Sequence, residues 1–75
     1  MKLLAFGKIA EIIKTSACTL PPLNNTDELQ AWLKQNYPNL NDLPYQIAVD
    51  KKIVLQNTVL HPNAEIALLP PFSGG

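Results

Sequence analysis

The chain closes with the stretch Ile66-Ala67-Leu68-Leu69-Pro70-Pro71-Phe72-Ser73-Gly74-Gly75, an apolar run followed by two prolines and two glycines. The apolar run predicts a strand, and the prolines end it because they offer no N–H to a ladder. Proline also favours an extended chain, whereas glycine lacks a Cβ and fits narrow channels. We therefore predict a domain over residues 1–69 and a flexible, reactive tail over residues 70–75 that reaches into another protein's pocket.

A second uniformly apolar run, Leu3-Leu4-Ala5-Phe6, stands near the start of the chain and ends at Gly7. This run is apolar at every position, which predicts a strand buried on both faces. The first and last strands are the most uniformly apolar of the chain, as expected of a central pair that a helix covers on one side. After the first strand, the mixed spacing of Ile9, Ile12 and Ile13 favours a wide connection or a single helical turn. A strand follows at residues 17–20.

One main helix is predicted between two proline signals, Pro21-Pro22 before it and Pro38 at its end. Asn25 or Thr26 can cap it, and with Asn25 as the cap Glu28 occupies the third position of a capping box. Its apolar residues recur on one face, which predicts packing against the sheet. This stripe consists of Leu29, Trp32, Leu33 and Tyr37.

The second half of the chain reads as strands joined by short turns. The expected pieces are a strand over 46–50 with Ile47 and Val49 inward, a turn at Lys51-Lys52, a return over 53–55, an extended segment at 58–60, a turn at 61–64 and a strand over 65–69. If the first and last strands pair in parallel, this α+β order gives a β-grasp fold, a mixed sheet with one main helix and an extended C-terminal tail. Ile66 and Leu68 then face the core, and Leu69 leaves on the opposite face beside the tail.

Composition excludes several function classes. The 75 residues suit one domain, and six basic residues balance six acidic ones, so neither nucleic acid nor an anionic membrane is expected as a partner. Cys18 and His61 are the only residues of their types, which leaves no internal disulfide and no Cys/His zinc site, and we expect both to be structural. With no signal sequence or membrane span, a cytoplasmic location is expected.

No residue set for catalysis is present in the body of the chain. Gly7 is the only glycine outside the tail, so no phosphate-binding loop is formed, and a Ser/His/Asp or Cys/His set is not supported by one histidine and one cysteine. The unusual chemistry is therefore at the terminal carboxylate. We expect the chain to be a non-catalytic subunit that acts through partner enzymes, without a bound cofactor or metal.

Over essentially its whole length the sequence resembles the small subunits of molybdopterin synthase, a family of ubiquitin-like sulfur carriers. The most specific part of the resemblance is Pro70-Pro71, one apolar residue, a small hydroxyl residue and Gly-Gly after an apolar strand. Three positions depart from the family pattern: Ala10 stands where an arginine is frequent, Asp50 replaces an asparagine, and Pro62-Asn63-Ala64 replaces an Asp-Gly-Asp turn.

This resemblance implies a mechanism. An E1-like adenylyltransferase activates the carboxylate of Gly75 with ATP, and a sulfur donor converts it to a thiocarboxylate. The tail, including Gly74, then enters the large synthase subunit in a heterotetramer, where the sulfur attacks cyclic pyranopterin monophosphate during molybdenum cofactor biosynthesis. The implied partner-binding residues are Phe6, Ile53, Leu69, Pro70, Pro71, Phe72 and Ser73.

Three other functions are compatible with a glycine pair at the end of such a fold. The chain is then a sulfur carrier for thiamine or tRNA thiolation, although thiamine carriers generally lack the proline pair. It is alternatively a ubiquitin-like modifier that forms isopeptide bonds through Gly75. The last alternative is a binding module whose tail is an inert, frayed terminus.

Overall fold

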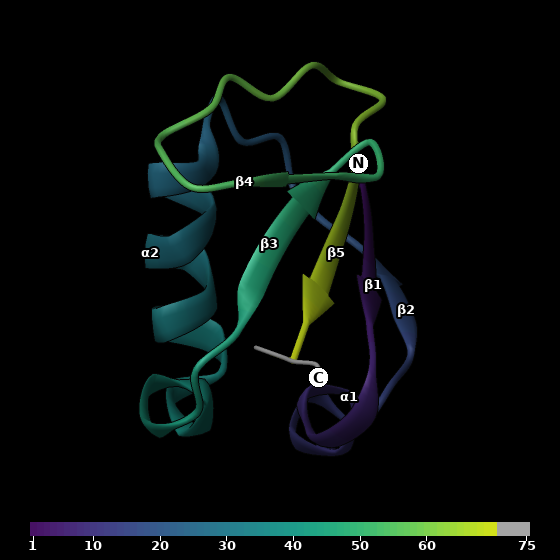
Figure 1. The fold of residues 1–75 in the computed structure, drawn as a ribbon, viewed down its shortest axis with the longest axis vertical. Coiled ribbons are helices and arrows are strands. Elements are labelled where there is room, and N and C mark those ends of the chain that lie inside the picture. The colour runs from purple at the N-terminus through teal and green to yellow at the C-terminus, as the bar shows by residue number, and fades with distance from the viewer. Residues whose placement is uncertain (71–75) are drawn as a thin grey trace.

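The computed structural model describes residues 1–70 as a mixed five-stranded sheet with one long helix across one face (Figure 1). The strands are β1 (Lys2–Ala5), β2 (Ala17–Thr19), β3 (Gln46–Val49), β4 (Lys52–Val54) and β5 (Glu65–Leu69). The helices are α1 (Gly7–Ile13), α2 (Thr26–Asn36) and the 3-10 helix η1 (Pro38–Asp42). The strand order is β2-β1-β5-β3-β4, with β1 and β5 parallel and the other pairs antiparallel. The predicted α+β, β-grasp arrangement is confirmed.

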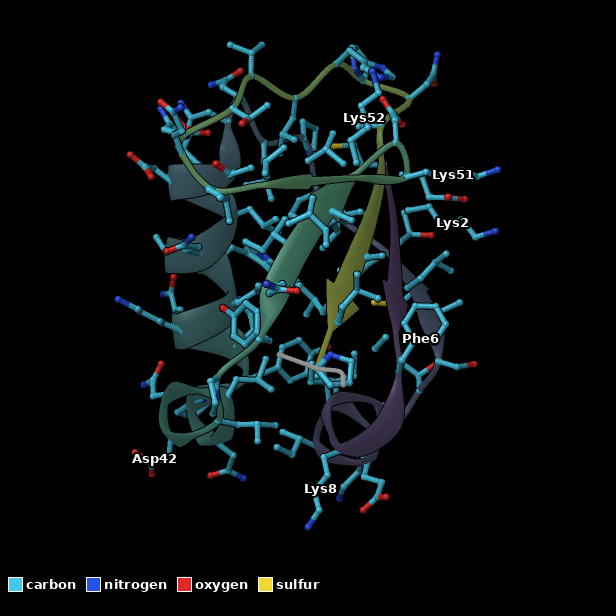
Figure 2. The ribbon with its side chains drawn as sticks, in the orientation of Figure 1. Lys2, Phe6, Lys8, Asp42, Lys51 and Lys52 are labelled. Atoms are coloured by element: carbon cyan, nitrogen blue, oxygen red, sulfur yellow. The ribbon has the colours of Figure 1, made fainter. Side chains whose placement is uncertain are left out.

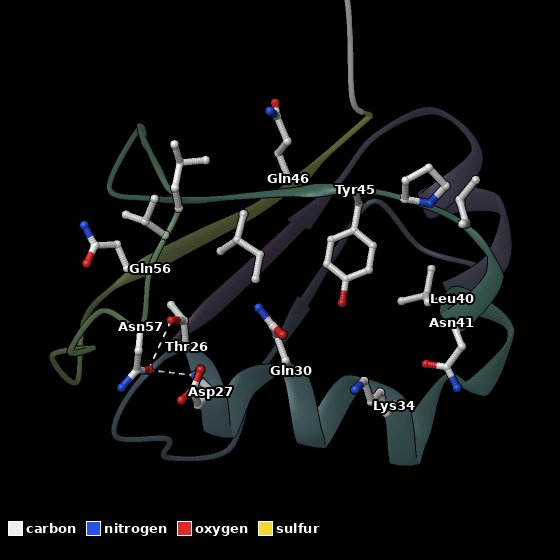
Figure 3. Close-up of a pocket in the computed structure, with 15 residues that line it drawn as sticks. Thr26, Asp27, Gln30, Lys34, Leu40, Asn41, Tyr45, Gln46, Gln56 and Asn57 are labelled. Carbon is white, nitrogen blue, oxygen red and sulfur yellow. Dashed lines mark hydrogen bonds between the residues drawn. The ribbon is translucent and has the colours of Figure 1, made fainter.

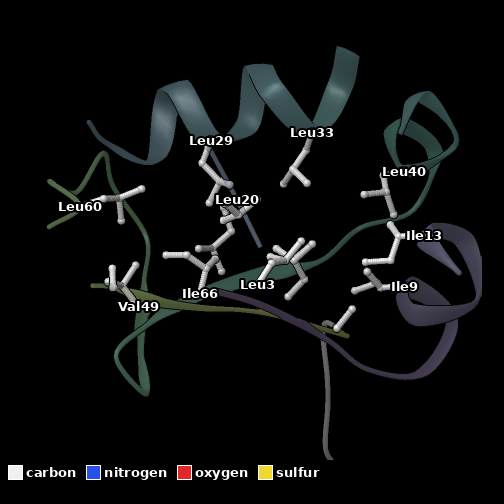
Figure 4. Packing of buried hydrophobic residues seen from close by; sticks show 14 residues of the cluster. Leu3, Ile9, Ile13, Leu20, Leu29, Leu33, Leu40, Val49, Leu60 and Ile66 are labelled. Carbon is white, nitrogen blue, oxygen red and sulfur yellow. The ribbon is translucent and has the colours of Figure 1, made fainter. Parts of the chain in front are cut away.

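The core lies between α2 and the inner face of the sheet (Figure 4). Leu29 and Leu33 of α2 are fully buried, as the helical stripe predicts, and they belong to one cluster with Leu3, Ile66 and Leu68 of the two central strands. Burying each of these side chains contributes roughly 1.5–3 kcal/mol relative to leaving it exposed. The central parallel pair is therefore fixed by apolar contacts on the helix side of the sheet.

The prediction that the first strand is buried on both faces is wrong. Leu3 and Ala5 are buried, but Leu4 is only half-buried, and Phe6, which lies beyond the end of β1, is 46% exposed. The same alternation appears in β5, where Ile66 and Leu68 are buried between half-buried neighbours. Since α2 covers one face, successive side chains of these strands alternate between the core and the open face.

The segment after β1 is a helix of two turns, longer than the connection or single turn that the sequence predicts. Ile9 and Ile13 stand four residues apart and are both buried, and together they anchor α1 beneath the sheet end. Phe6 at the N-cap makes no side-chain capping bond, and Lys14 ends the helix in a left-handed conformation (φ 65°). The helix therefore depends on its buried isoleucines rather than on local capping signals.

At the start of α2, Asn25 is the cap, as predicted, and its side-chain oxygen accepts from the Glu28 N–H at 2.9 Å. The reciprocal half of the capping box does not form. The Glu28 carboxylate instead accepts from the backbone N–H of Asn24 at 2.9 Å, one residue further back. The predicted cap is thus correct, and the predicted return bond is displaced by one residue.

A second cap comes from the loop between β4 and β5. The side-chain oxygen of Asn57 accepts from the Asp27 N–H at 2.9 Å and from the Thr26 hydroxyl at 3.3 Å. The Thr26 hydroxyl in turn accepts from the Thr58 N–H at 2.9 Å. The segment predicted to be extended at residues 58–60 contributes an isolated bridge between Val59 and Asn25 rather than a strand.

The side chain of Asn57 accepts hydrogen bonds from the first turn of α2, although Asn57 lies far from α2 in the sequence. We therefore expect Asn57→Ala to lower the free energy of unfolding by about 1–2 kcal/mol. Asn57→Asp, which keeps the acceptor and places a negative charge at the helix N-terminus, should lose much less. Denaturant titration at neutral pH measures both variants. Equal losses would show that the acceptor is not what stabilises this junction.

The β3–β4 turn lies one residue earlier than the predicted Lys51-Lys52. Asp50 (φ 51°) and Lys51 (φ 72°) are its two central residues, and Val49 pairs with Lys52 across it. Two positive φ angles in a two-residue hairpin loop define a type I′ turn, whose twist matches that of the strands. The sequence Asp-Lys lacks the usual glycine, which is why the turn is easily misplaced by one residue.

Candidate partner-binding face at the root of the tail

The open face of the sheet carries an apolar row that crosses all five strands. The strand register places Leu4 opposite both Ala17 and Ala67, and it places Ala48 opposite both Ala67 and Ile53. Residues paired across neighbouring strands lie on the same face. We call the residues Ala17, Leu4, Ala67, Ala48 and Ile53 the outer row.

Two larger side chains extend the outer row toward one end of the sheet. Phe6 follows Leu4 by two residues through extended backbone, and Leu69 follows Ala67 by two residues in β5. Both therefore point to the face away from α2, where Figure 2 shows Phe6. Ile53 is 51% exposed and Leu69 is half-buried. The structure thus brings the three residues predicted by resemblance, Phe6, Ile53 and Leu69, onto one face.

Sequence reasoning missed the residues between them. Leu4, Ala48 and Ala67 join Phe6 and Leu69 to Ile53, and none was singled out from the sequence. The signal that could have found Leu4 and Ala67 is the two-residue period of a strand with one open face. Both central strands are apolar at nearly every position, so this period is invisible until the register is known.

The tail begins beside this face. Because β1 and β5 are parallel, Phe6-Gly7 and Leu69-Pro70 lie at the same end of the sheet. Gly7 has a positive φ of 57°, and a Cβ built on it would stand 3.7 Å from Cγ of Pro70. Pro70 is exposed. The remaining predicted tail residues, Pro71, Phe72, Ser73, Gly74 and Gly75, lie outside the described residues.

The other end of the sheet is held by an exposed carboxylate. Asp50 accepts from the Glu65 N–H at 3.0 Å through Oδ1, and its Oδ2 lies 2.6 Å from Nε2 of His61. The backbone bond from Glu65, and after it the contact with His61, lower the pKa of Asp50 below its usual value. This carboxylate, which departs from the family asparagine, links the β3–β4 turn to the start of β5.

The other two departures from the family pattern keep ordinary backbone geometry. In the turn at residues 62–64, the Ala64 N–H donates to the His61 carbonyl at 3.0 Å, and Ala64 itself is fully buried. Ala10 lies half-buried in α1. The turn before β5 is therefore closed without the glycine that the family pattern has there.

A carboxyl group whose pKa is lower in the folded state stabilises the fold above its unfolded pKa of about 4, and this stabilisation is lost as the pH falls through the folded value. We therefore expect Asp50→Asn to lower the melting temperature at pH 7, with a difference from the parent chain that shrinks below pH 4. His61→Ala should have a smaller effect because the Glu65 bond remains. Thermal unfolding across pH 2–7 tests this, and a difference independent of pH would contradict it.

Between residues 1 and 70, no three His, Cys, Asp or Glu side chains are grouped so that they could hold a metal ion. Cys18 is half-buried in β2, and His61 lies in a loop. No helix in this part of the chain has the length and apolar character needed to cross a membrane.

Comparison with known proteins adds a family and several relatives. The model of the ThiS family matches residues 3–75. The human molybdopterin synthase sulfur carrier subunit is 37% identical over 82 aligned residues, and the alignment covers 100% of this chain and 93% of the human protein.

Two solved structures have the same fold. One is SAMP1 from Haloferax volcanii, with a TM-score of 0.77 and 16% identity, covering 99% of this chain and 97% of that one. The other is a chain in the complex of subunits 1 and 2 of molybdopterin-converting factor from Helicobacter pylori, with a TM-score of 0.74 and 28% identity, covering 99% and 96%. The first likeness concerns the fold alone, while the second joins the fold to a detectable sequence relationship.

Proposed function

The chain belongs to the ThiS family, and from this premise we propose that it is the sulfur carrier subunit of a molybdopterin synthase. The full-length similarity to the human sulfur carrier subunit supports this pathway among those open to such carriers. The Helicobacter neighbour, solved in a complex of two subunits, supports a large subunit as the partner. The observation that carries the proposal is that Phe6 and Leu69 extend the apolar outer row to the root of the tail.

The docking surface that we propose consists of the outer row with Phe6 and Leu69. Side chains that are half-exposed and apolar on an open sheet face gain from burial against a partner, and such contiguous faces mark interaction sites. Ala48 and Ala67 lie side by side in the register between Leu4 and Ile53. Ala48 is already buried in the free chain, so the gain would come chiefly from the larger side chains around it, Leu4, Phe6, Ile53 and Leu69.

The tail then supplies the chemistry. The Gly75 carboxylate attacks the α-phosphorus of ATP in an E1-like adenylyltransferase, which releases pyrophosphate and leaves an acyl adenylate. A donor that provides sulfur as sulfide displaces AMP, forming a C–S bond as the C–O bond to AMP breaks. In the large subunit the thiocarboxylate sulfur attacks a carbon of cyclic pyranopterin monophosphate and displaces an oxygen substituent there. Water then cleaves the C–S bond of the resulting thioester, which leaves the sulfur on the pterin and restores the Gly75 carboxylate.

This division of labour agrees with the body of the chain having no catalytic set. ATP and the sulfur donor act through partner enzymes, and the chain itself contributes a carrier group and a docking face. Leu69 belongs to the docking surface, and the tail begins at the next residue, Pro70. Binding of the docking surface to the large subunit would therefore also direct the tail toward that subunit. Gly74 and residues 70–73 serve as the inserted arm in this proposal.

Intact mass spectrometry tests the chemistry directly. The purified chain is incubated with its adenylyltransferase, ATP and sulfide, beside a chain that lacks Gly75. The proposal predicts a mass gain equal to the replacement of one oxygen by sulfur in the complete chain only. No gain from an adenylyltransferase that modifies its own carrier would overturn the proposal, and attachment to lysines of other proteins would favour a modifier.

A further inference from the structure

A groove of about 470 Å³ lies on the helix side of the sheet, between α2, η1 and the edge formed by β3 and β4 (Figure 3). This volume falls within the range of ligand-binding clefts. Its apolar floor includes Leu40, Ile47 and Val54. Ile47 and Val54 are paired in the register, on the face opposite the outer row. The groove is therefore separate from the proposed docking surface.

Three side chains that can donate hydrogen bonds line this groove, Tyr45 on the β3 side and Gln30 and Lys34 on α2. Figure 3 shows Tyr45 pointing from the start of β3 toward α2, where Gln30 and Lys34 project from the helix. Burial raises the pKa of Tyr45, so its hydroxyl remains a donor at neutral pH. Among the described residues, no ion pair engages the Lys34 ammonium. These groups together present one positive charge and two neutral donors to the groove.

Charge is unevenly distributed along the groove. Asp27 lies on the same helix two turns before Lys34, so one end of the groove is acidic and the other basic. Side-chain amides of Gln30, Gln56 and Asn57 line the space along with these charges, and amides both donate to and accept from peptide groups. A polyphosphate ligand is disfavoured by the acidic end and by the single lysine.

We propose that this groove binds an extended, acidic peptide segment of a partner protein, with a carboxylate held by Lys34, Tyr45 and Gln30. Charge-assisted hydrogen bonds are the strong ones, and the ammonium with the two neutral donors matches a carboxylate in both charge and donor number. Apolar side chains that flank the acidic residue lie on the floor formed by Leu40 and Val54. The acidic group is oriented toward Lys34 because Asp27 repels it from the other end.

Peptide binding in this groove would be a function additional to the proposed sulfur-carrier function. The groove uses the inner sides of β3 and β4, whereas the docking surface uses their outer sides. A partner can therefore occupy the groove while the outer row and the tail are engaged elsewhere. The binding test below needs neither ATP nor a large subunit, so its failure and the failure of the sulfur-carrier proposal are distinguishable.

Amide chemical-shift titration by NMR tests the proposal with a blocked pentapeptide that has a central glutamate between two leucines. We expect saturable shifts at Gln30, Lys34 and Tyr45. Replacing the peptide glutamate with glutamine should weaken binding about fivefold or more. Absence of shifts, or equal affinity for the two peptides, would overturn the proposal.

Variants of the chain identify the groups involved. Lys34→Gln and Tyr45→Phe should each weaken binding of the glutamate peptide by several fold, whereas Lys14→Gln, which removes a lysine outside the groove, should not. Equal affinity for the parent chain and Lys34→Gln would overturn the assignment. Sodium acetate is a further probe, because equal shifts from acetate at the same concentration would show a carboxylate site with no peptide recognition and would overturn the proposed occupant.

Discussion

Deleting Gly75 is expected to abolish thiocarboxylate formation and to reduce sulfur transfer by about a hundredfold or more, without a measurable change in thermal stability. The reaction takes place at the terminal carbonyl carbon, and a carboxylate moved by one residue no longer meets the groups that activate it. Among the described residues 1–70, the buried members of the core cluster run from Leu3 to Leu68, so we expect the fold to be retained without Gly75. Transfer is measured in single turnovers with the adenylyltransferase and the large subunit present.

Two further variants separate the effect of position from the effect of the residue. A glycine added after Gly75 keeps the glycine pair but displaces the carboxylate outward, and we expect the same loss. A glycine added before Met1 changes the length equally and should leave transfer unchanged. Normal transfer from the extended tail would contradict a reaction that requires a fixed reach, and a lost unfolding transition would show that the terminus supports the fold.

Ile53→Glu is expected to weaken association with the large subunit by about thirtyfold, which corresponds to about 2 kcal/mol. The substitution places a charge on the docking surface, where binding would remove it from water without a partner. Ile53 is already half-exposed at the sheet edge, so the free chain tolerates the glutamate. Isothermal titration calorimetry measures the affinity.

The matched control for this variant is Val59→Glu. Val59 is also β-branched and is 81% exposed, but it lies in the loop between β4 and β5 rather than on the sheet. The same charge there should leave the affinity unchanged. If the two variants bound equally well, the outer row would not be the docking surface, although the tail chemistry could still be correct.

The elements that were predicted correctly carry strong local signals. Asn25 with Glu28 marked the start of α2, Pro38 marked its end, and Leu29 with Leu33 marked its buried side. The alternation at Ile47 and Val49 similarly gave β3 and its inward face. These patterns depend on residues close together in the sequence, and they can therefore be recognised before the fold is known.

The sequence-based predictions were wrong or incomplete where contacts between distant segments determine burial and helix formation. The continuous apolar run in β1 suggested burial on both faces, but α2 covers only one face of the sheet and leaves Leu4 half-buried. The helix α1 has no capping signal and is held by Ile9 and Ile13. The Asn57 cap joins segments about 30 residues apart, as its bond to Asp27 shows, and no local pattern announces such a contact.

The residues of the candidate site likewise fall into those that the sequence predicts and those that only the structure reveals. Phe6, Ile53 and Leu69 entered by family resemblance, and Leu69 also followed from strand alternation. The same alternation could have found Ala67, two residues before Leu69, but Ala48 carries little information until the strand register places it on the open face. The inner groove around Tyr45 requires β3 and α2 to face each other, and this juxtaposition is a property of the fold rather than of either segment.

The central position of β5 has a consequence for biosynthesis. Translation produces the β1–β2 pair and the β3–β4 hairpin before residues 65–69, and each pair then has an unpaired strand edge where β5 will lie. Two-stranded units of this size have little stability alone, so the sheet closes only when the last strand leaves the ribosome. The outer row, whose middle residue Ala67 lies in β5, is therefore complete only when β5 has joined the β1–β2 pair to the β3–β4 hairpin.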